Sequence, residues 1–317
     1  MNNSEIKKYL NYLNFKKFYK PTFRSCEICD SMDTKVFIRK ISWNINKFGV
    51  LPVHCCNNCG MVFQNPRFNK DFYFNYYKKI YRDITLKTQN PSKDFTNDQI
   101  KRGKILYNFL KPLLPKKGSM LDVGCSVGLM MREFIKNNWK CVGNDPVQSH
   151  VEWGKNKFKL PVEWMQSEDM DIKKNSLDLI IIMGSIDHVY DLNRVMKKCQ
   201  NSIKNNGILV LEARGNPLGR TYKYFNHSHH RYFSHTTIQL LMIKFGWEPF
   251  LTTSYPITGP SRKNTIFCLG KYKGNKISKN FKKLIKFGKK DTFEDVLYKF
   301  NYFDYISKKN PGKVLLR

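Results

Sequence analysis

Between residues 119 and 272, apolar runs typical of strands alternate with stretches that have helical spacing. The strand-like runs are SMLDVG, KCVGND, VEWM, LDLIIIMG and GILVLEARG, and the helical stretches among them include LMMREFIKNN, SHVEWGKNKF and LNRVMKKCQNSI. Because consecutive parallel strands need a crossover between them, this alternation predicts an α/β fold with a doubly wound, mostly parallel sheet. We expect it to end with a helix over TTIQLLMIKFG and strands over WEPFLTTSY and NTIFCLGKY.

A turn of small residues follows the first predicted strand, where the chain reads DVGCSVG from Asp122 to Gly128. Such a turn lets the backbone approach a ligand closely. The next strand ends in Asp145, where a carboxylate can accept hydrogen bonds from both hydroxyls of a ribose. A dinucleotide site would use the order GxGxxG, which this DxGxSxG turn lacks. The pattern therefore favours a nucleoside cofactor other than NAD.

The turn resembles the first motif of class I S-adenosylmethionine-dependent methyltransferases, (D/E)xGxGxG, with Ser126 in place of the middle glycine. The resemblance continues to about residue 270 through LDLI, GSIDHV, GILVLE and HHRYFS followed by FGW. It implies a Rossmann-like fold and S-adenosyl-L-methionine as the cofactor. By this resemblance, Asp169 accepts a hydrogen bond from the adenine amino group, and Met170 offers backbone and packing contacts to the cofactor. The alternative role for Asp169 is that of a helix N-cap. The cofactor-binding residues expected are Asp122, Gly124, Ser126, Gly128, Asp145, Asp169 and Met170.

Two CxxC pairs lie near the N-terminus, Cys26 with Cys29 and Cys56 with Cys59. Four thiolates satisfy tetrahedral zinc and leave no open position, so we predict a structural Zn²⁺ site in a zinc-ribbon-like module. His54 and Cys55 are near enough to compete with Cys56 in the assignment of the fourth ligand, but Cys56 gives the CxxCG spacing. The alternatives are unmetallated thiols and, less in keeping with the pattern, a redox pair, since neither CxxC opens a helix after a strand.

The segment CNNCGMVFQNPR, followed by YYKKIY, resembles a subgroup of these methyltransferases with an N-terminal zinc-binding module. Members of that subgroup commonly modify sugars, nucleotide-linked sugars or surface-glycan precursors, so the resemblance implies a small-molecule acceptor of this kind. Tyr77 and Tyr81 lie within the resemblance, and they are expected either to close over the cofactor or to pack between domains.

The acceptor's proton needs a base near the carboxyl ends of the strands, where open α/β sheets bind ligands. Histidine titrates near neutral pH, and His188 and His229 are the candidate catalytic residues by their positions. His188 has the alternative role of a structural hydrogen bond at a helix start. His227, His230 and His235 crowd the same stretch as His229 and are substitutes for it.

Lys and Arg number 56 against 25 acidic residues, a net charge of +31, which suits a polyanionic partner. An RNA methyltransferase with an N-terminal zinc module is therefore the second hypothesis, although the positive charge is spread along the chain. A non-catalytic zinc scaffold that kept the fold is the third hypothesis. The sequence does not indicate the oligomeric state, the identity of the acceptor molecule or which of its atoms is methylated.

The expected organisation is a basic segment and zinc-binding module over 1–67, an aromatic linker over 68–95, a methyltransferase domain over 96–270 and a basic tail over 271–317. The tail is either a docked helix around DTFEDVLYKFNYF or partly disordered. Thr96 or Asn97 is expected to cap the first long helix, and Pro112 and Pro115 to end it. No apolar run reaches the length of a membrane helix and no signal peptide is recognisable, so we expect a cytoplasmic enzyme.

Overall fold

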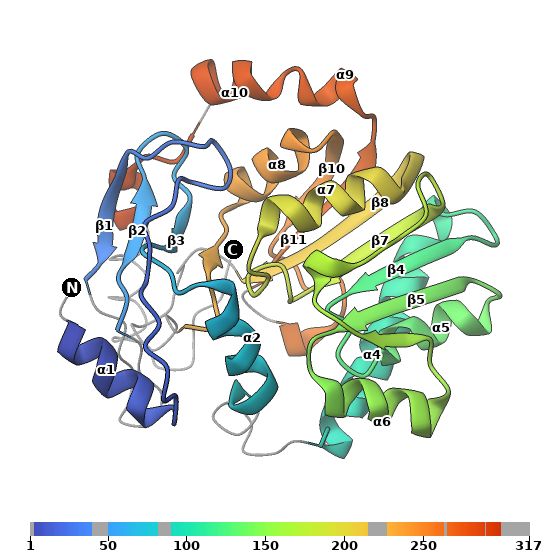
Figure 1. Ribbon diagram of the computed structural model, residues 1–317. Coiled ribbons are helices and arrows are strands. Elements are labelled where there is room, and N and C mark those ends of the chain that lie inside the picture. The colour runs from blue at the N-terminus through green and yellow to red at the C-terminus, as the bar shows by residue number, and fades with distance from the viewer. Residues whose placement is uncertain are drawn as a thin grey trace.

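The computed structural model describes residues 3–39, 50–81, 90–214, 227–262, 265–288 and 290–298. Two β-sheets lie beside each other, a large sheet flanked by helices and a small sheet built mainly from the N-terminal part of the chain (Figure 1). The helices α1 (Asn3–Tyr12) and α2 (Lys70–Lys79) lie below the small sheet in that view.

The large sheet has seven strands in the order β10-β11-β8-β7-β4-β5-β6. The first five in chain order are parallel, and β11 enters antiparallel between β8 and β10. The chain order reverses at β4, because β5 lies on one side of it and β7 on the other. Such a switch point opens a crevice at the carboxyl ends of the strands. The strands are β4 (Ser119–Val123), β5 (Lys140–Asp145), β6 (Val162–Trp164), β7 (Leu177–Met183), β8 (Ile203–Arg214), β10 (Trp247–Thr253) and β11 (Thr265–Tyr272).

Alternate residues of the central strands point to opposite faces, and each face is covered by helices. Leu179 and Ile181 of β7 pack in one apolar cluster with residues of α4 (Lys93–Leu110), α5 (Arg132–Lys136) and α6 (Gln148–Phe158). Ile180 and Ile182 pack in another with residues of α7 (Leu192–Ser202) and α8 (His235–Lys244). Strands buried on both faces read as continuous apolar runs, which explains the sequence LDLIIIM.

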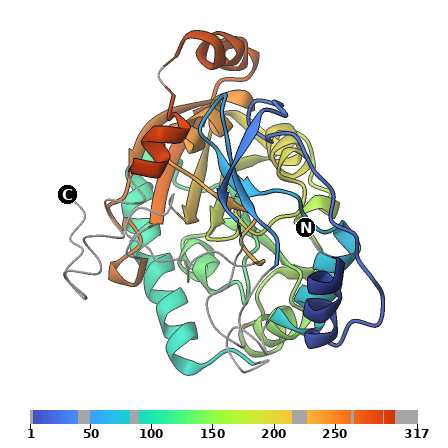
Figure 2. The same ribbon diagram turned by 90° about the vertical axis from the view of Figure 1, so that its left-hand side faces the viewer.

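The small sheet has the order β1-β2-β3-β9, with every neighbouring pair antiparallel. β1 (Thr34–Ile38), β2 (Val53–Cys56) and β3 (Val62–Gln64) come from the cysteine-containing segment, but β9 (Arg231–Tyr232) comes from the loop before α8. Viewed after a quarter turn, this sheet packs across the end of the large one (Figure 2). Part of the late chain therefore completes a sheet that starts near the N-terminus.

Aromatic side chains join α1 and α2 into a third apolar cluster. Phe68 and Phe72 stack with ring centroids 4.1 Å apart, and Phe72 meets Tyr19 edge to face at 5.4 Å. Ile6, Tyr9 and Leu10 of α1 belong to the same buried group. Beyond β11, the short helices α9 (Asn275–Ser278) and α10 (Phe281–Phe287) lead to a helical stretch over 293–298, whose Phe293 and Val296 pack against the small sheet.

The predicted fold class is confirmed, with every strand expected from residue 119 onward present. The predicted cap of α4 is wrong, since Ser92 accepts a hydrogen bond from the Phe95 backbone N–H and the helix starts before Thr96. Residues 40–49, which follow β1, and the tail from 299 lie outside the described residues. None of the described helices has the length and apolarity needed to cross a bilayer.

Candidate functional site

A cavity of about 440 Å³ opens at the carboxyl ends of β4, β5 and β7, where the sheet order reverses. One wall is formed by the turns after β4 and β5, and the opposite wall by α2 and the segment after β7. A cavity of this size is in the range that holds small ligands and cofactors. Its lining includes Lys70, Phe74, Tyr77, Tyr81, Asp98, Gly124, Ser126, Asp145, Gln166, Ser167, Glu168, Ser185, His188, Arg214 and Arg262.

The turn after β4 is held tightly against its neighbours. Gly124 has φ +71°, and a Cβ there would lie 2.5 Å from the Cβ of Ser185, so only glycine fits. Ser126 also has a positive φ, +56°, and its hydroxyl lies 2.7 Å from Nδ1 of His150. Gly128, at φ +79°, approaches Val162. Ser126, which stands where the motif has its middle glycine, thus still adopts the left-handed backbone conformation of the turn.

Asp145 ends β5 and fixes the two turns that border the cavity. Its Oδ2 accepts from the Ser126 N–H at 2.8 Å, and its Oδ1 accepts from the Val147 N–H at 2.9 Å. These two hydrogen bonds fix the orientation of the carboxylate, which lines the cavity. Gly124, Ser126 and Asp145, which the sequence predicts as cofactor-binding residues, all line the cavity, and their role in binding stays a prediction.

Asp122 lies behind this rim, at the end of β4, with 2% of its surface exposed. Burial, reinforced by the charge of Asp145, raises the pKa of the Asp122 carboxyl to about 7. Its Oδ2 makes no hydrogen bond within the described part of the chain. A buried acceptor of this kind is suited to pairing with a positively charged group or a water at the cavity.

The structure does not bring Asp169 and Met170 to the cavity. Asp169 is half exposed and pairs with Lys70 at 3.2 Å and Arg194 at 3.5 Å, while Met170 is buried in the core beside α7. Gln166 and Ser167, just before them, line the cavity instead. The alternative role for Asp169, an N-cap, is also not seen, since it closes the short 3-10 helix η3 (Ser167–Asp169). The segment that the sequence predicts beside the adenine therefore reaches the cavity through Gln166, Ser167 and Glu168, and its role in cofactor binding stays a prediction.

The wall opposite Asp145 carries His188. Its Nδ1 lies 3.0 Å from the hydroxyl of Tyr77, which itself donates to the carbonyl of Ser228 at 3.1 Å. The His229 ring lies 4.7 Å from the His188 ring, and Asp187 Oδ2 is 3.8 Å from Nε2 of each. The two predicted catalytic histidines are therefore brought together. Asp187, which precedes His188 in the sequence, is a third member that sequence reasoning missed.

The other histidines of that stretch have different partners. His227 Nε2 accepts from the Val50 N–H at 2.9 Å, and burial lowers the pKa of His227 to about 3. His230 Nδ1 donates to the Val189 carbonyl at 3.1 Å, and its pKa is also held well below the usual range by burial. His235 Nε2 lies 3.2 Å from the Ser254 hydroxyl. Only His188 and His229 of the five face Asp187.

The four paired cysteines meet at one point of the small sheet. Cys26 Sγ lies 3.5 Å from Cys59 Sγ, Cys29 Sγ lies 3.5 Å from Cys56 Sγ, and all four sulfur atoms are within 4.8 Å of one another. Tetrahedral zinc with bonds of about 2.3 Å places its sulfur ligands about 3.8 Å apart, so the donor set fits this ion. His54 is turned away from the cluster, with Nδ1 2.9 Å from the Thr34 hydroxyl.

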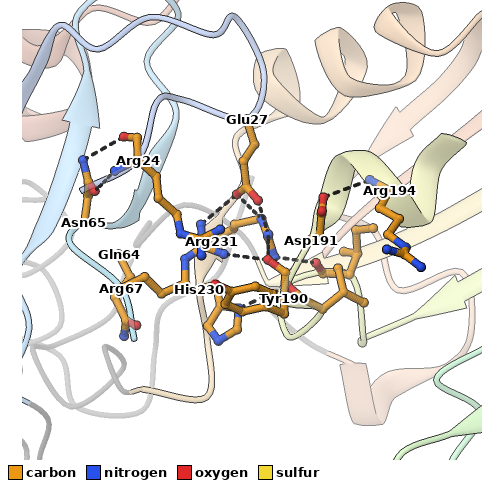
Figure 3. A network of polar contacts seen from close by, with 12 residues as sticks. Arg24, Glu27, Gln64, Asn65, Arg67, Tyr190, Asp191, Arg194, His230 and Arg231 are labelled. Carbon is orange, nitrogen blue, oxygen red and sulfur yellow. Dashed lines mark hydrogen bonds and ion pairs between the residues drawn. The ribbon is translucent and has the colours of Figure 1, made fainter. Parts of the chain in front are cut away.

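A buried ionic network connects the cysteine cluster to the cavity wall (Figure 3). Glu27, within the first CxxC, accepts from Arg67 at 3.0 Å and from Arg231 at 2.5 and 2.6 Å. Burial raises the pKa of Glu27, but the two guanidinium groups outweigh it and hold the value at about 2. The same arginines donate to the carbonyls of Val189 and Tyr190, which line the cavity. Sequence reasoning missed Glu27, because nothing local marks its partners.

Together, the switch-point cavity and the rim of Gly124, Ser126 and Asp145 define an α/β domain with a candidate ligand site at the carboxyl ends of its strands. Residues 98–251 match a family described as a methyltransferase domain. This stretch, slightly less than half of the chain, is therefore similar to a methyltransferase domain. This match does not include the cysteine-containing segment.

Two similar proteins are named ubiquinone biosynthesis O-methyltransferase. The one from Rhodopseudomonas palustris is 30% identical over 111 residues, 33% of this chain and 42% of that protein. The one from Pelagibacter ubique is 30% identical over 119 residues, 36% of this chain and 47% of that protein. The chain thus spans less than half the length of the relatives it matches.

Similar solved structures include 1,6-didemethyltoxoflavin-N1-methyltransferase from Burkholderia thailandensis, bound to 1,6-didemethyltoxoflavin and S-adenosylhomocysteine. It is 16% identical, with a TM-score of 0.46 over 64% of this chain and 85% of that one. An S-adenosylmethionine-dependent methyltransferase from Mesorhizobium loti is 13% identical, with a TM-score of 0.42 over 53% of this chain and 97% of that one.

Proposed function

We propose that the chain is an S-adenosylmethionine-dependent methyltransferase that acts on a small-molecule acceptor. The observation that carries the proposal is Asp145, positioned by the Ser126 and Val147 amides at the switch point of a domain with a methyltransferase family match. Asp145 would hold the ribose hydroxyls, and Gln166 and Ser167 lie where the adenine would follow. The cofactor, when bound, supplies an activated methyl group on a sulfonium.

Catalysis then consists mainly of positioning and of removing a proton from the acceptor. His188 lines the cavity opposite the cofactor rim, and His229 and Asp187 stand directly behind it. We assign this trio to the acceptor side, where it assists loss of the acceptor's proton. Tyr77 and Tyr81 line the same wall, which supports the expectation that they close over the cofactor.

The acceptor we propose is a hydroxylated small molecule, of the sugar or nucleotide-linked sugar kind. Arg214, Arg262 and Lys70 give the cavity cationic groups suited to a phosphate or carboxylate on such an acceptor. The names of the ubiquinone biosynthesis O-methyltransferases support transfer to oxygen of a small molecule. The +31 charge keeps an RNA acceptor as the second candidate.

We further propose that Cys26, Cys29, Cys56 and Cys59 hold one structural Zn²⁺. The four sulfur atoms leave no open ligand position, so the ion would stabilise the small sheet and take no part in the reaction.

The test is calorimetric titration of the full chain with S-adenosylmethionine and, separately, with NAD. We expect binding of the first alone. Asp145→Ala should weaken it by more than about tenfold, because a hydrogen-bonded charged contact is lost. The matched control is Glu163→Ala, an exposed carboxylate of β6 that is not among the lining residues of the cavity, which should change affinity by less than about twofold.

Equal losses in the two variants would contradict the assignment of Asp145, and binding of NAD would mean that the glycine turn serves another cofactor. Acceptor classes are separated with nucleotide-sugars and RNA as methyl acceptors at several salt concentrations. Turnover of RNA with a steep salt dependence would favour the second candidate.

A further inference from the structure

Asp187, His188 and His229 form a compact group of possible metal ligands, separate from the cysteine cluster. One ligand atom from each lies within 4.8 Å of the others, and the Asp187 carboxylate is 3.8 Å from both imidazole Nε2 atoms. Ligands around one ion at about 2.1 Å stand about 3 to 3.5 Å apart, so the side chains need to close by only about 1 Å. His188 lines the cavity, so the group is reachable from it.

Hydrogen bonding fixes the tautomer of neutral His188. Tyr77 donates its single hydroxyl proton to the Ser228 carbonyl, because a carbonyl can only accept. The contact between Tyr77 and His188 Nδ1 must then be a donation from the imidazole Nδ1–H to the phenol oxygen. This leaves the lone pair of neutral His188 on Nε2, the atom nearest Asp187. Metal-binding histidines are commonly oriented in this way, by a hydrogen bond from the nitrogen that does not bind the metal.

Asp187 provides an independent indication. Its side chain is fully buried, and neither carboxylate oxygen has a hydrogen-bond partner among the residues that the structure describes. Burying a carboxylate without hydrogen bonds or a cation is costly. The Nε2 atom of neutral His188 carries a lone pair and lies 3.8 Å from the same carboxylate, which adds repulsion. Both features are relieved by one positive ion between the three side chains.

We propose that Asp187, His188 and His229 bind a divalent transition-metal ion at the wall of the cavity. Two imidazoles and one carboxylate are ligands suited to Zn²⁺, Mn²⁺ or Fe²⁺, and they leave coordination positions open. The open side faces the cavity through His188, where an oxygen of a hydroxylated acceptor would complete the coordination shell. A bound ion lowers the pKa of such a hydroxyl, so the trio would assist proton loss through the ion that it holds. This role rests on the proposed function, whereas the metal site rests on the geometry alone.

The experiment is a titration of the zinc-replete full chain with Mn²⁺, followed by the electron paramagnetic resonance signal of the free ion. Mn²⁺ prefers oxygen and nitrogen ligands and binds more weakly than Zn²⁺, so it does not displace zinc from the cysteines. We expect a single Mn²⁺ site. Asp187→Asn and His229→Gln should each weaken it by at least about tenfold. Asp98→Asn, which neutralises another carboxylate lining the cavity, should leave Mn²⁺ affinity unchanged.

Absence of a Mn²⁺ site in the wild-type chain would overturn the proposal, and a protonated His188 would then be the cation beside Asp187. Equal affinity in wild type and Asp187→Asn would overturn it as well. S-adenosylmethionine affinity and thermal unfolding of each variant show whether the cavity and fold are intact. If the cofactor binds and Mn²⁺ does not, only the metal site fails; if Mn²⁺ binds and the cofactor does not, the proposed function fails and the metal site stands.

Discussion

The two sheets of this protein are stabilised in different ways. In the large sheet, alternate residues such as Leu179 and Ile180 pack into separate apolar clusters on opposite faces, so many side chains share the stabilisation. The small sheet has strands of two to five residues and depends on a few polar or metal-binding groups, the four cysteines and Glu27 with its arginines. Removing one group should therefore matter much more in the small sheet than in the large one.

The largest effect we expect is at the cysteine cluster. Cys59→Ser should remove the bound zinc and lower the free energy of unfolding of the small sheet by more than about 5 kcal/mol, since structural zinc contributes about 10 to 16 kcal/mol in peptides. Cys55→Ala is the control, because Cys55 is a buried neighbour whose thiol lies outside the cluster, and it should cost only about 1 kcal/mol. Zinc content by atomic absorption and thermal unfolding measure both. Full zinc stoichiometry in Cys59→Ser would refute the four-cysteine site.

The next effect is at the junction of the sheets. Glu27→Gln leaves Arg67 and Arg231 buried without their counter-charge, which should cost about 3 to 5 kcal/mol in denaturant unfolding. Asp30→Asn, three residues away, breaks an exposed ion pair with Lys244 and should cost less than about 0.5 kcal/mol. Similar losses of unfolding free energy in the two variants would show that the Glu27 network does not stabilise the small sheet more than an exposed ion pair does.

Asp122 is an exception within the large sheet, since it is a buried polar group among apolar residues. Its pKa is raised from 3.8 to about 7, so between these values the folded chain keeps a proton that the unfolded chain has lost. Stability is therefore highest at the acid end of this window and falls as pH rises through about 7, by up to about 4 kcal/mol.

Asp122→Asn cannot lose that proton. The difference in unfolding free energy between the variant and the wild type should therefore shift in favour of the variant from about pH 4 to about pH 8. Denaturant titrations at several pH values measure the difference without the cofactor. A difference that does not change with pH would mean that Asp122 is ionised throughout.

The sequence predicts the large sheet well, and brings the candidate cofactor rim together in one cavity wall, because these signals are local. The strand of β4, the turn with Gly124 and Ser126, and Asp145 at the end of the next strand lie within one short stretch of chain. Asp169 shows the limit of this reasoning, because the structure pairs it with Lys70 and Arg194 outside the cavity lining, and no local pattern indicates those partners.

The small sheet and the acceptor wall could be predicted only in part. The spacing of the cysteines indicates a metal site, but nothing in the sequence indicates that Arg231 pairs across the sheet with Phe63 or bonds to Glu27, far earlier in the chain. Tyr77 and His188 are likewise far apart in sequence and meet through tertiary structure. Long-range contacts of this kind follow from the global arrangement rather than from local patterns.

The pairing of β9 with β3 has a consequence for how this protein can be divided. A cut between the cysteine-containing segment and the later chain would leave β3 with an open edge, and Arg231 buried in an interface that no longer exists. Neither fragment would be a self-sufficient part that recombination could move to another protein. The two regions are expected to be gained, lost and inherited together, as one cooperative unit rather than as independent domains.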